Sequence, residues 1–133
     1  MKATPLFPMA LYCVVLGSAV AQGSVDPADP KVPMPKGALS YQTMRPYLKQ
    51  NCFKCHSGPQ PKAEFAMDTY SGLMRGGEDG VMVKKGNGEG SDLVKFLRGA
   101  LKPQMPKRAD PLPEADIKAI SNWIQQGARE KAL

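Results

Sequence analysis

Residues 52–56 read Cys52-Phe53-Lys54-Cys55-His56, and this short stretch decides how the rest of the chain is interpreted. The chain of 133 residues has three cysteines and one histidine, so the stretch holds two of the cysteines and the only histidine. A disulfide between Cys52 and Cys55 would close a loop too short to stabilise much of a fold. The pair therefore needs another chemical explanation.

Two thiols at this spacing, followed directly by an imidazole, are typical of covalent haem attachment. The thiols form thioethers with two vinyl groups on the same side of the macrocycle, and the next residue directs its imidazole at the iron. The motif predicts one covalent haem c, bound at Cys52 and Cys55, with His56 as an axial iron ligand. The alternatives are a disulfide, a thioredoxin-like redox pair, a zinc site and a chance motif with an inert histidine.

The N-terminal residues have the pattern of an export signal. Lys2 supplies a positive charge, residues 9–21 are apolar and uncharged, and Ala19-Val20-Ala21 fits a signal-peptidase site. We predict a Sec-type signal peptide at residues 1–21 and a periplasmic mature protein, which is where haem c is assembled. Retention of this segment as a membrane anchor is the alternative. The apolar run is shorter than the roughly 20 residues of a membrane span, which favours cleavage.

The remaining residues predict one small all-α domain. Residues 22–37 contain four prolines and are interpreted as a semi-rigid linker, which leaves 38–133 as the domain. No segment alternates as a strand would, and apolar residues recur at helical spacing. We expect three to four helices around one haem, with long loops between them. The predicted helices span residues 46–55, 69–74, 92–98 and 113–126, the first of them starting at Pro46.

The sixth iron ligand must be sought elsewhere, because a single histidine excludes ligation by two histidines of one chain. Methionine is the next candidate. Met105 directly precedes Pro106 in a proline-rich loop between two predicted helices, and it is far enough from His56 in sequence to reach the opposite haem face. Met82 is the second choice. Methionine is also a common core residue, and the other candidates are Met34, Met44, Met67 and Met74.

The charge balance bears on partners. The chain carries +6, which favours an acidic partner protein or surface. The positive charges are scattered and aromatic residues are few, so nucleic-acid binding is not indicated. Eight cationic residues could surround an exposed haem edge, although for any single one ordinary solvated surface is the commoner explanation: Lys49, Lys54, Lys62, Lys84, Lys85, Lys102, Lys107 and Arg108.

Several segments in series resemble a known family. Besides the haem motif they are Arg45-Pro46, Gly76-Gly77-Glu78, Met105-Pro106, and the closing run from Pro113-Glu114-Ala115-Asp116-Ile117 to Trp123-Ile124-Gln125-Gln126-Gly127-Ala128. Over residues 41–128 this series resembles the planctomycete-type cytochrome c domain. Two departures are Lys85, where that family usually has proline, and Lys107, which replaces its second proline after the methionine.

The resemblance implies a class I cytochrome c-like fold whose first and last helices cross. It also implies that Met105 is the axial methionine. Ligation by His56 and Met105 fills both axial positions and leaves no site for a substrate. We therefore predict a mono-haem carrier of single electrons by outer-sphere transfer, not an enzyme, with a redox partner that has an acidic docking surface. The alternatives are a haem subunit of a periplasmic oxidoreductase complex and, with less support, a haem peroxidase or sensor.

Overall fold

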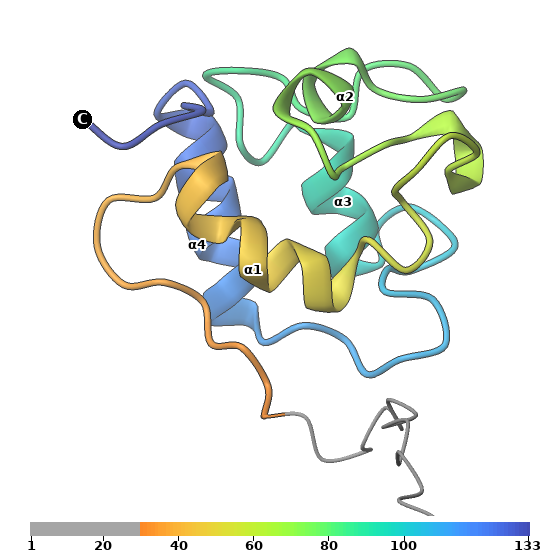
Figure 1. Ribbon diagram of the computed structural model, residues 1–133, viewed down its shortest axis with the longest axis horizontal. Helices are drawn as coiled ribbons and strands as arrows, with labels where there is room; N and C mark the ends of the chain where they lie inside the picture. The colour runs from red at the N-terminus through yellow and green to blue at the C-terminus, as the bar shows by residue number, and fades with distance from the viewer. Residues whose placement is uncertain (1–29) are drawn as a thin grey trace, which may run out of the picture.

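The computed structural model describes residues 30–133, so the predicted signal peptide and the first half of the predicted linker lie outside the described residues. Four helices follow one another: α1 (Tyr41–Asn51), α2 (Tyr70–Arg75), α3 (Asp92–Arg98) and α4 (Glu114–Gln125), with a 3-10 turn η1 at Lys62–Glu64. Within residues 30–133 there is no strand, which confirms the predicted all-α class with long loops (Figure 1). None of the helices described is long and apolar enough to cross a membrane.

The first helix begins earlier than the sequence predicted. Ser40 and Thr43 form a capping box, in which the Thr43 N–H donates to the Ser40 hydroxyl and the Ser40 N–H donates to the Thr43 hydroxyl. Pro46 therefore lies inside α1 and not at its first position, and the predicted start was wrong. The helix ends at Asn51, which leaves the haem motif in the turns that follow.

The C-terminal segment holds the start of α1. The N–H groups of Tyr41 and Gln42 donate to the carbonyls of Arg129 and Glu130, at 2.9 and 3.0 Å. The first-turn N–H groups of a helix have no partner within the helix, so these bonds stabilise an early start. Because proline has no backbone N–H, Pro46 cannot donate a hydrogen bond within the helix, and the two bonds to Arg129 and Glu130 offset that loss.

The other helices lie close to their predicted ranges. The Thr69 hydroxyl caps α2 by accepting from the Gly72 N–H at 3.1 Å. Gly99 ends α3 with φ at 76°, in the left-handed region that glycine adopts without strain. Ser91 precedes α3 and is a residue type that commonly caps a helix, but its hydroxyl donates instead to the Asn87 carbonyl at 2.7 Å. The last helix, α4, is one residue shorter at each end than predicted.

The core is one cluster of buried side chains to which every helix contributes. Helix α4 buries an apolar face that includes Trp123 and Ile124. Helix α1 crosses α4 (Figure 1), and the Tyr47 hydroxyl donates to an Asp116 carboxylate oxygen at 2.7 Å. This is the crossing of first and last helices that the resemblance implied. Helix α3 packs against α4 on another side.

Part of the predicted linker contacts the domain. Val32, Met34 and Leu39 are partly buried against the core. The Val32 N–H also donates to the side-chain carbonyl of Gln50 at 2.6 Å. The chain therefore runs along the end of α1 that leads into the haem motif before it turns into that helix.

Candidate haem site

The motif occupies two tight turns at the end of α1. The Cys52 N–H donates to the Leu48 carbonyl at 2.7 Å and continues the helical pattern for one residue. The N–H groups of Cys55 and His56 then both donate to the Cys52 carbonyl, at 3.2 and 3.0 Å. These turns bring two thiols and one imidazole to the same end of the helix.

Both motif cysteines are free thiols, so the disulfide considered as an alternative is not formed. Their surroundings differ. Cys55 is exposed, whereas burial raises the pKa of the Cys52 thiol to about 12 and keeps it protonated at neutral pH. In residues 30–133, no three His, Cys, Asp or Glu side chains gather in a way that could hold a metal ion by themselves.

The His56 ring has a defined orientation. Its Nδ1 lies 3.1 Å from the Phe65 carbonyl oxygen, and the ring meets the Phe65 ring edge-on, with centroids 5.5 Å apart. A carbonyl can only accept, so Nδ1 carries the proton and Nε2 keeps a lone pair. Histidines that bind metals commonly have this arrangement, in which the second nitrogen is fixed by a backbone carbonyl. His56 is therefore suited to ligate iron through Nε2.

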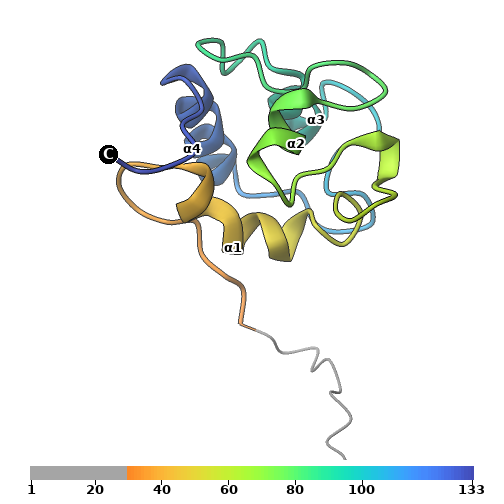
Figure 2. The ribbon, with the colours of Figure 1, turned by 45° about the horizontal axis from the view of Figure 1, so that its top comes forward.

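The methionines divide into buried core residues and partly buried ones. Met44, Met67 and Met82 are 1%, 3% and 5% exposed, so their thioethers are enclosed by the core. Met105 is only partly buried and lies in the α3–α4 loop, where its N–H donates to the Phe96 carbonyl at 3.0 Å. That loop runs beside the motif loop in both views (Figures 1 and 2). The assignment of Met105 as sixth ligand stays a prediction, and this placement favours it over Met82.

The residues of the site fit a covalently bound haem. Two free thiols lie three residues apart in the sequence. The imidazole between them and residues 65–68 is held through Nδ1, which leaves Nε2 for iron. A thioether lies on the neighbouring loop. The sequence had indicated these four residues, but not Phe65, because no local pattern shows which remote carbonyl meets a given imidazole.

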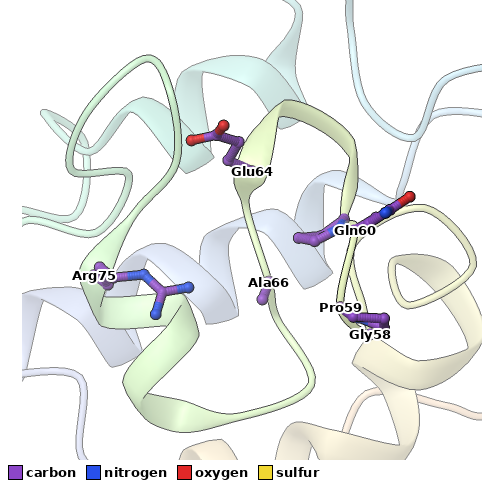
Figure 3. Close-up of a pocket in the computed structure, with 7 residues that line it drawn as sticks. Gly58, Pro59, Gln60, Glu64, Ala66 and Arg75 are labelled. Carbon is purple, nitrogen blue, oxygen red and sulfur yellow. The ribbon is translucent and has the colours of Figure 1, made fainter.

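A hollow of about 500 Å³ opens beside the motif loop, and Figure 3 shows its lining. None of the four predicted site residues lines it, so it is distinct from the site itself. The Arg75 guanidinium points across it toward Ala66. The lining combines the segment after the motif, the stretch around η1 and the end of α2: Gly58, Pro59, Gln60, Pro61, Glu64, Ala66 and Arg75.

The lysines predicted to surround a haem edge are not equivalent. Lys54 and Lys62 are exposed on either side of Cys55, and the Lys62 N–H donates to the Cys55 carbonyl at 2.8 Å. Lys84 instead pairs with Asp92 at 3.5 Å, and the Lys85 ammonium lies 5.6 Å from the centre of the Tyr70 ring. Only some of the predicted cations therefore flank the motif.

A helical fold with a fixed imidazole beside two free thiols fits a c-type cytochrome domain. The comparison with family models supports the resemblance: the model described as Planctomycete cytochrome C matches residues 52–108, from the first motif cysteine to just beyond Met105. These residues are therefore similar to the planctomycete-type cytochrome c domain that the motifs indicated. This family implies covalently bound haem and haem-based electron transfer. Searches of curated proteins and of solved structures gave no match.

Proposed function

We propose that this protein is a mono-haem c-type cytochrome that carries single electrons by outer-sphere transfer in the periplasm. The observation that supports this most directly is the contact between His56 Nδ1 and the Phe65 carbonyl, next to two free thiols. When bound, the haem iron supplies one-electron chemistry by alternating between its ferric and ferrous states. The protein's residues bind the cofactor, orient it and control access to it.

Each residue has a separate task in this proposal. Cys52 and Cys55 hold the macrocycle covalently, so the cofactor is retained in both oxidation states. His56 binds one face through Nε2, while Met105 approaches the other face from the α3–α4 loop. With both axial positions filled, no substrate reaches the metal, and transfer of an electron is the function that remains.

The exposed end of the motif is the proposed route for the electron. Cys55 is exposed and is flanked by the exposed Lys54 and Lys62, whose charges are not engaged in ion pairs within residues 30–133. A positive surface accelerates encounter with a negative one by electrostatic steering. We therefore propose a redox partner protein with an acidic docking surface.

Covalent attachment is tested by expressing the full chain in a host that matures c-type cytochromes. We expect the wild type to keep haem on a denaturing gel, and intact mass to show one haem per chain. Cys52→Ala and Cys55→Ala should each weaken or abolish that retention. Cys13→Ala is the matched control, because it removes a cysteine outside the motif and should retain haem in full.

Two results would contradict the proposal. One is full haem retention in both motif variants. The other is absence of covalent haem from the wild type in a host that matures a second c-type cytochrome. Carbon monoxide separates a carrier from a sensor or peroxidase: the reduced wild type should be inert at neutral pH, and rapid binding would favour an open sixth position.

A further inference from the structure

Residues 65–68 run alongside the motif loop and contact it at three successive points. The Phe65 carbonyl meets His56 Nδ1 at 3.1 Å, and the Met67 N–H donates to the His56 carbonyl at 2.7 Å. One step further, an Asp68 carboxylate oxygen accepts from the Gly58 N–H at 3.2 Å. We call this arrangement the His56 clamp, because two of its contacts hold His56 directly and the third holds the loop just after it.

Helix α1 supports the clamp from the other side. The Tyr41 hydroxyl donates to the Met67 carbonyl at 2.9 Å, in a buried position. The Arg45 guanidinium lies within 3.5 Å of the Asp68 carbonyl, and it also sits 5.5 Å from the centre of the Phe53 ring. The segment that fixes the imidazole is thus itself anchored to the helix that directly precedes the first cysteine.

One end of the clamp borders open space. Gly58 and Ala66 both line the hollow of Figure 3. Gly58 has φ at 78°, and a Cβ added to it would meet no atom within 4 Å. A side chain at this position would therefore face open space. The Asp68–Gly58 hydrogen bond ties this end of the loop to residues 65–68, and one residue earlier the Ser57 hydroxyl donates to the Phe53 carbonyl at 2.6 Å.

We propose that Asp68 is a positioning residue for His56, and that the Asp68–Gly58 bond helps to set the reduction potential of the haem. The inference rests on the proposed function, since it concerns a haem bound at His56. A firm hydrogen bond from Nδ1 to a carbonyl makes an imidazole a better electron donor to its metal. A better donor stabilises the ferric form, so loosening the clamp favours the ferrous form and raises the potential.

Charge is the competing explanation, because any nearby carboxylate stabilises the ferric state regardless of geometry. Asp68→Asn separates the two effects, since it removes the charge and keeps an oxygen that can accept from Gly58. Asp68→Ala removes both. Glu64→Gln is the matched control, because Glu64 lines the same hollow as Gly58 and its carboxylate makes no side-chain hydrogen bond in the described part of the chain.

The experiment uses holoprotein and two readouts: the reduction potential, by spectroelectrochemistry, and the solvent exchange of the His56 Nδ1 proton, by nuclear magnetic resonance. At a given applied potential, we expect the ferrous-to-ferric ratio to be about 2- to 10-fold higher in Asp68→Ala than in Asp68→Asn. This is the factor to which one hydrogen bond corresponds. A tenfold factor is about 59 mV for one electron. The Nδ1 proton should exchange faster in Asp68→Ala by a similar factor, while Asp68→Asn and Glu64→Gln stay close to the wild type.

Equal potentials and equal exchange rates in Asp68→Ala and Asp68→Asn would overturn the inference. Should Asp68→Ala fail to fold, Asp68→Glu decides, because it keeps the charge and displaces the carboxylate by one methylene. We then expect faster Nδ1 exchange in Asp68→Glu, and a wild-type rate would overturn the proposal. A wild type without covalent haem would instead refute the proposed function, so the two failures are distinguishable.

Discussion

Removal of one hydroxyl from Tyr47 should weaken the tie between the helix that leads into the haem motif and the last helix. The side chain is 4% exposed, and its hydroxyl donates to the half-buried Asp116 carboxylate at 2.7 Å. Tyr47→Phe keeps the ring and its packing in α1 and deletes only this bond. It also leaves a carboxylate that must find another donor or water.

The expected cost follows from the charge on the acceptor. A hydrogen bond to a charged group contributes about 1.5–3 kcal/mol to the free energy of unfolding. In a domain of this size, a loss of about 1.5 kcal/mol lowers Tm by about 6–12 °C. Tyr70→Phe is the matched control, because its hydroxyl donates to the neutral Ala128 carbonyl at 2.8 Å. That variant should lose only about 1 kcal/mol.

The contribution of Tyr47 to the free energy of unfolding also depends on pH. Burial, and then the hydrogen bond to Asp116, raise the pKa of Tyr47 well above its ordinary value of 10.0. In the unfolded chain the phenol loses its proton near that ordinary value, while the folded chain keeps it. The contribution of Tyr47 is therefore fully present below about pH 10 and is lost as pH rises further. The stability difference between wild type and Tyr47→Phe should be constant at neutral pH and should shrink above pH 10.

The assay is urea unfolding of both holoproteins, followed by far-UV circular dichroism between about pH 7 and pH 11. A loss in Tyr47→Phe no larger than that in Tyr70→Phe would refute the reasoning about the charged acceptor. A stability difference that does not shrink in the alkaline range would refute the reasoning about the buried phenol.

Two further changes test the sixth ligand and the packing of the loop that contains Gly88. Met105→Leu should leave haem attached but remove the long-wavelength methionine–iron band and allow carbon monoxide to bind, whereas the buried Met82→Leu should keep the band. Survival of the band in the first variant and its loss in the second would assign Met82 instead. Gly88→Ala would place a methyl group against the Ser121 carbonyl, so we expect a loss of about 1–3 kcal/mol in urea unfolding. An unchanged midpoint would contradict the close packing of this loop on α4.

The start of α1 shows where sequence reasoning was misled. Pro46 is a plausible first helical residue, and this local signal was given more weight than the serine and threonine at positions 40 and 43. A capping box more often has Glu or Gln at its third residue, which made Ser40–Thr43 easy to overlook. The bonds that the Tyr41 and Gln42 N–H groups donate to the Arg129 and Glu130 carbonyls then stabilise the early start, and no local pattern reveals a contact between the two ends of a domain.

The candidate site divides in a similar way. The cysteine spacing, His56 and the Met105-Pro106 pair could be recognised because their chemistry is carried by neighbours in sequence. The residues that fix the imidazole could not, because Phe65 acts through its backbone carbonyl and Asp68 is part of no recognisable motif. A contact between segments nine or ten residues apart in irregular structure follows from the fold and not from periodicity.

These contacts link both proposed ligands to the crossing of α1 and α4. Met105 is bonded to α3 through the Phe96 carbonyl, and α3 packs on α4. The crossing, with its Tyr47–Asp116 bond, then connects α4 to α1, which ends just before Cys52. The two ligand loops have little regular structure of their own, so their separation depends on this chain of contacts.

Weakening the crossing in Tyr47→Phe should therefore loosen methionine ligation together with the fold. We expect the methionine–iron band of that variant to disappear at a lower urea concentration than in the wild type, in step with its circular dichroism. A band that persists to the wild-type midpoint would show that the α3–α4 loop is held independently of the crossing.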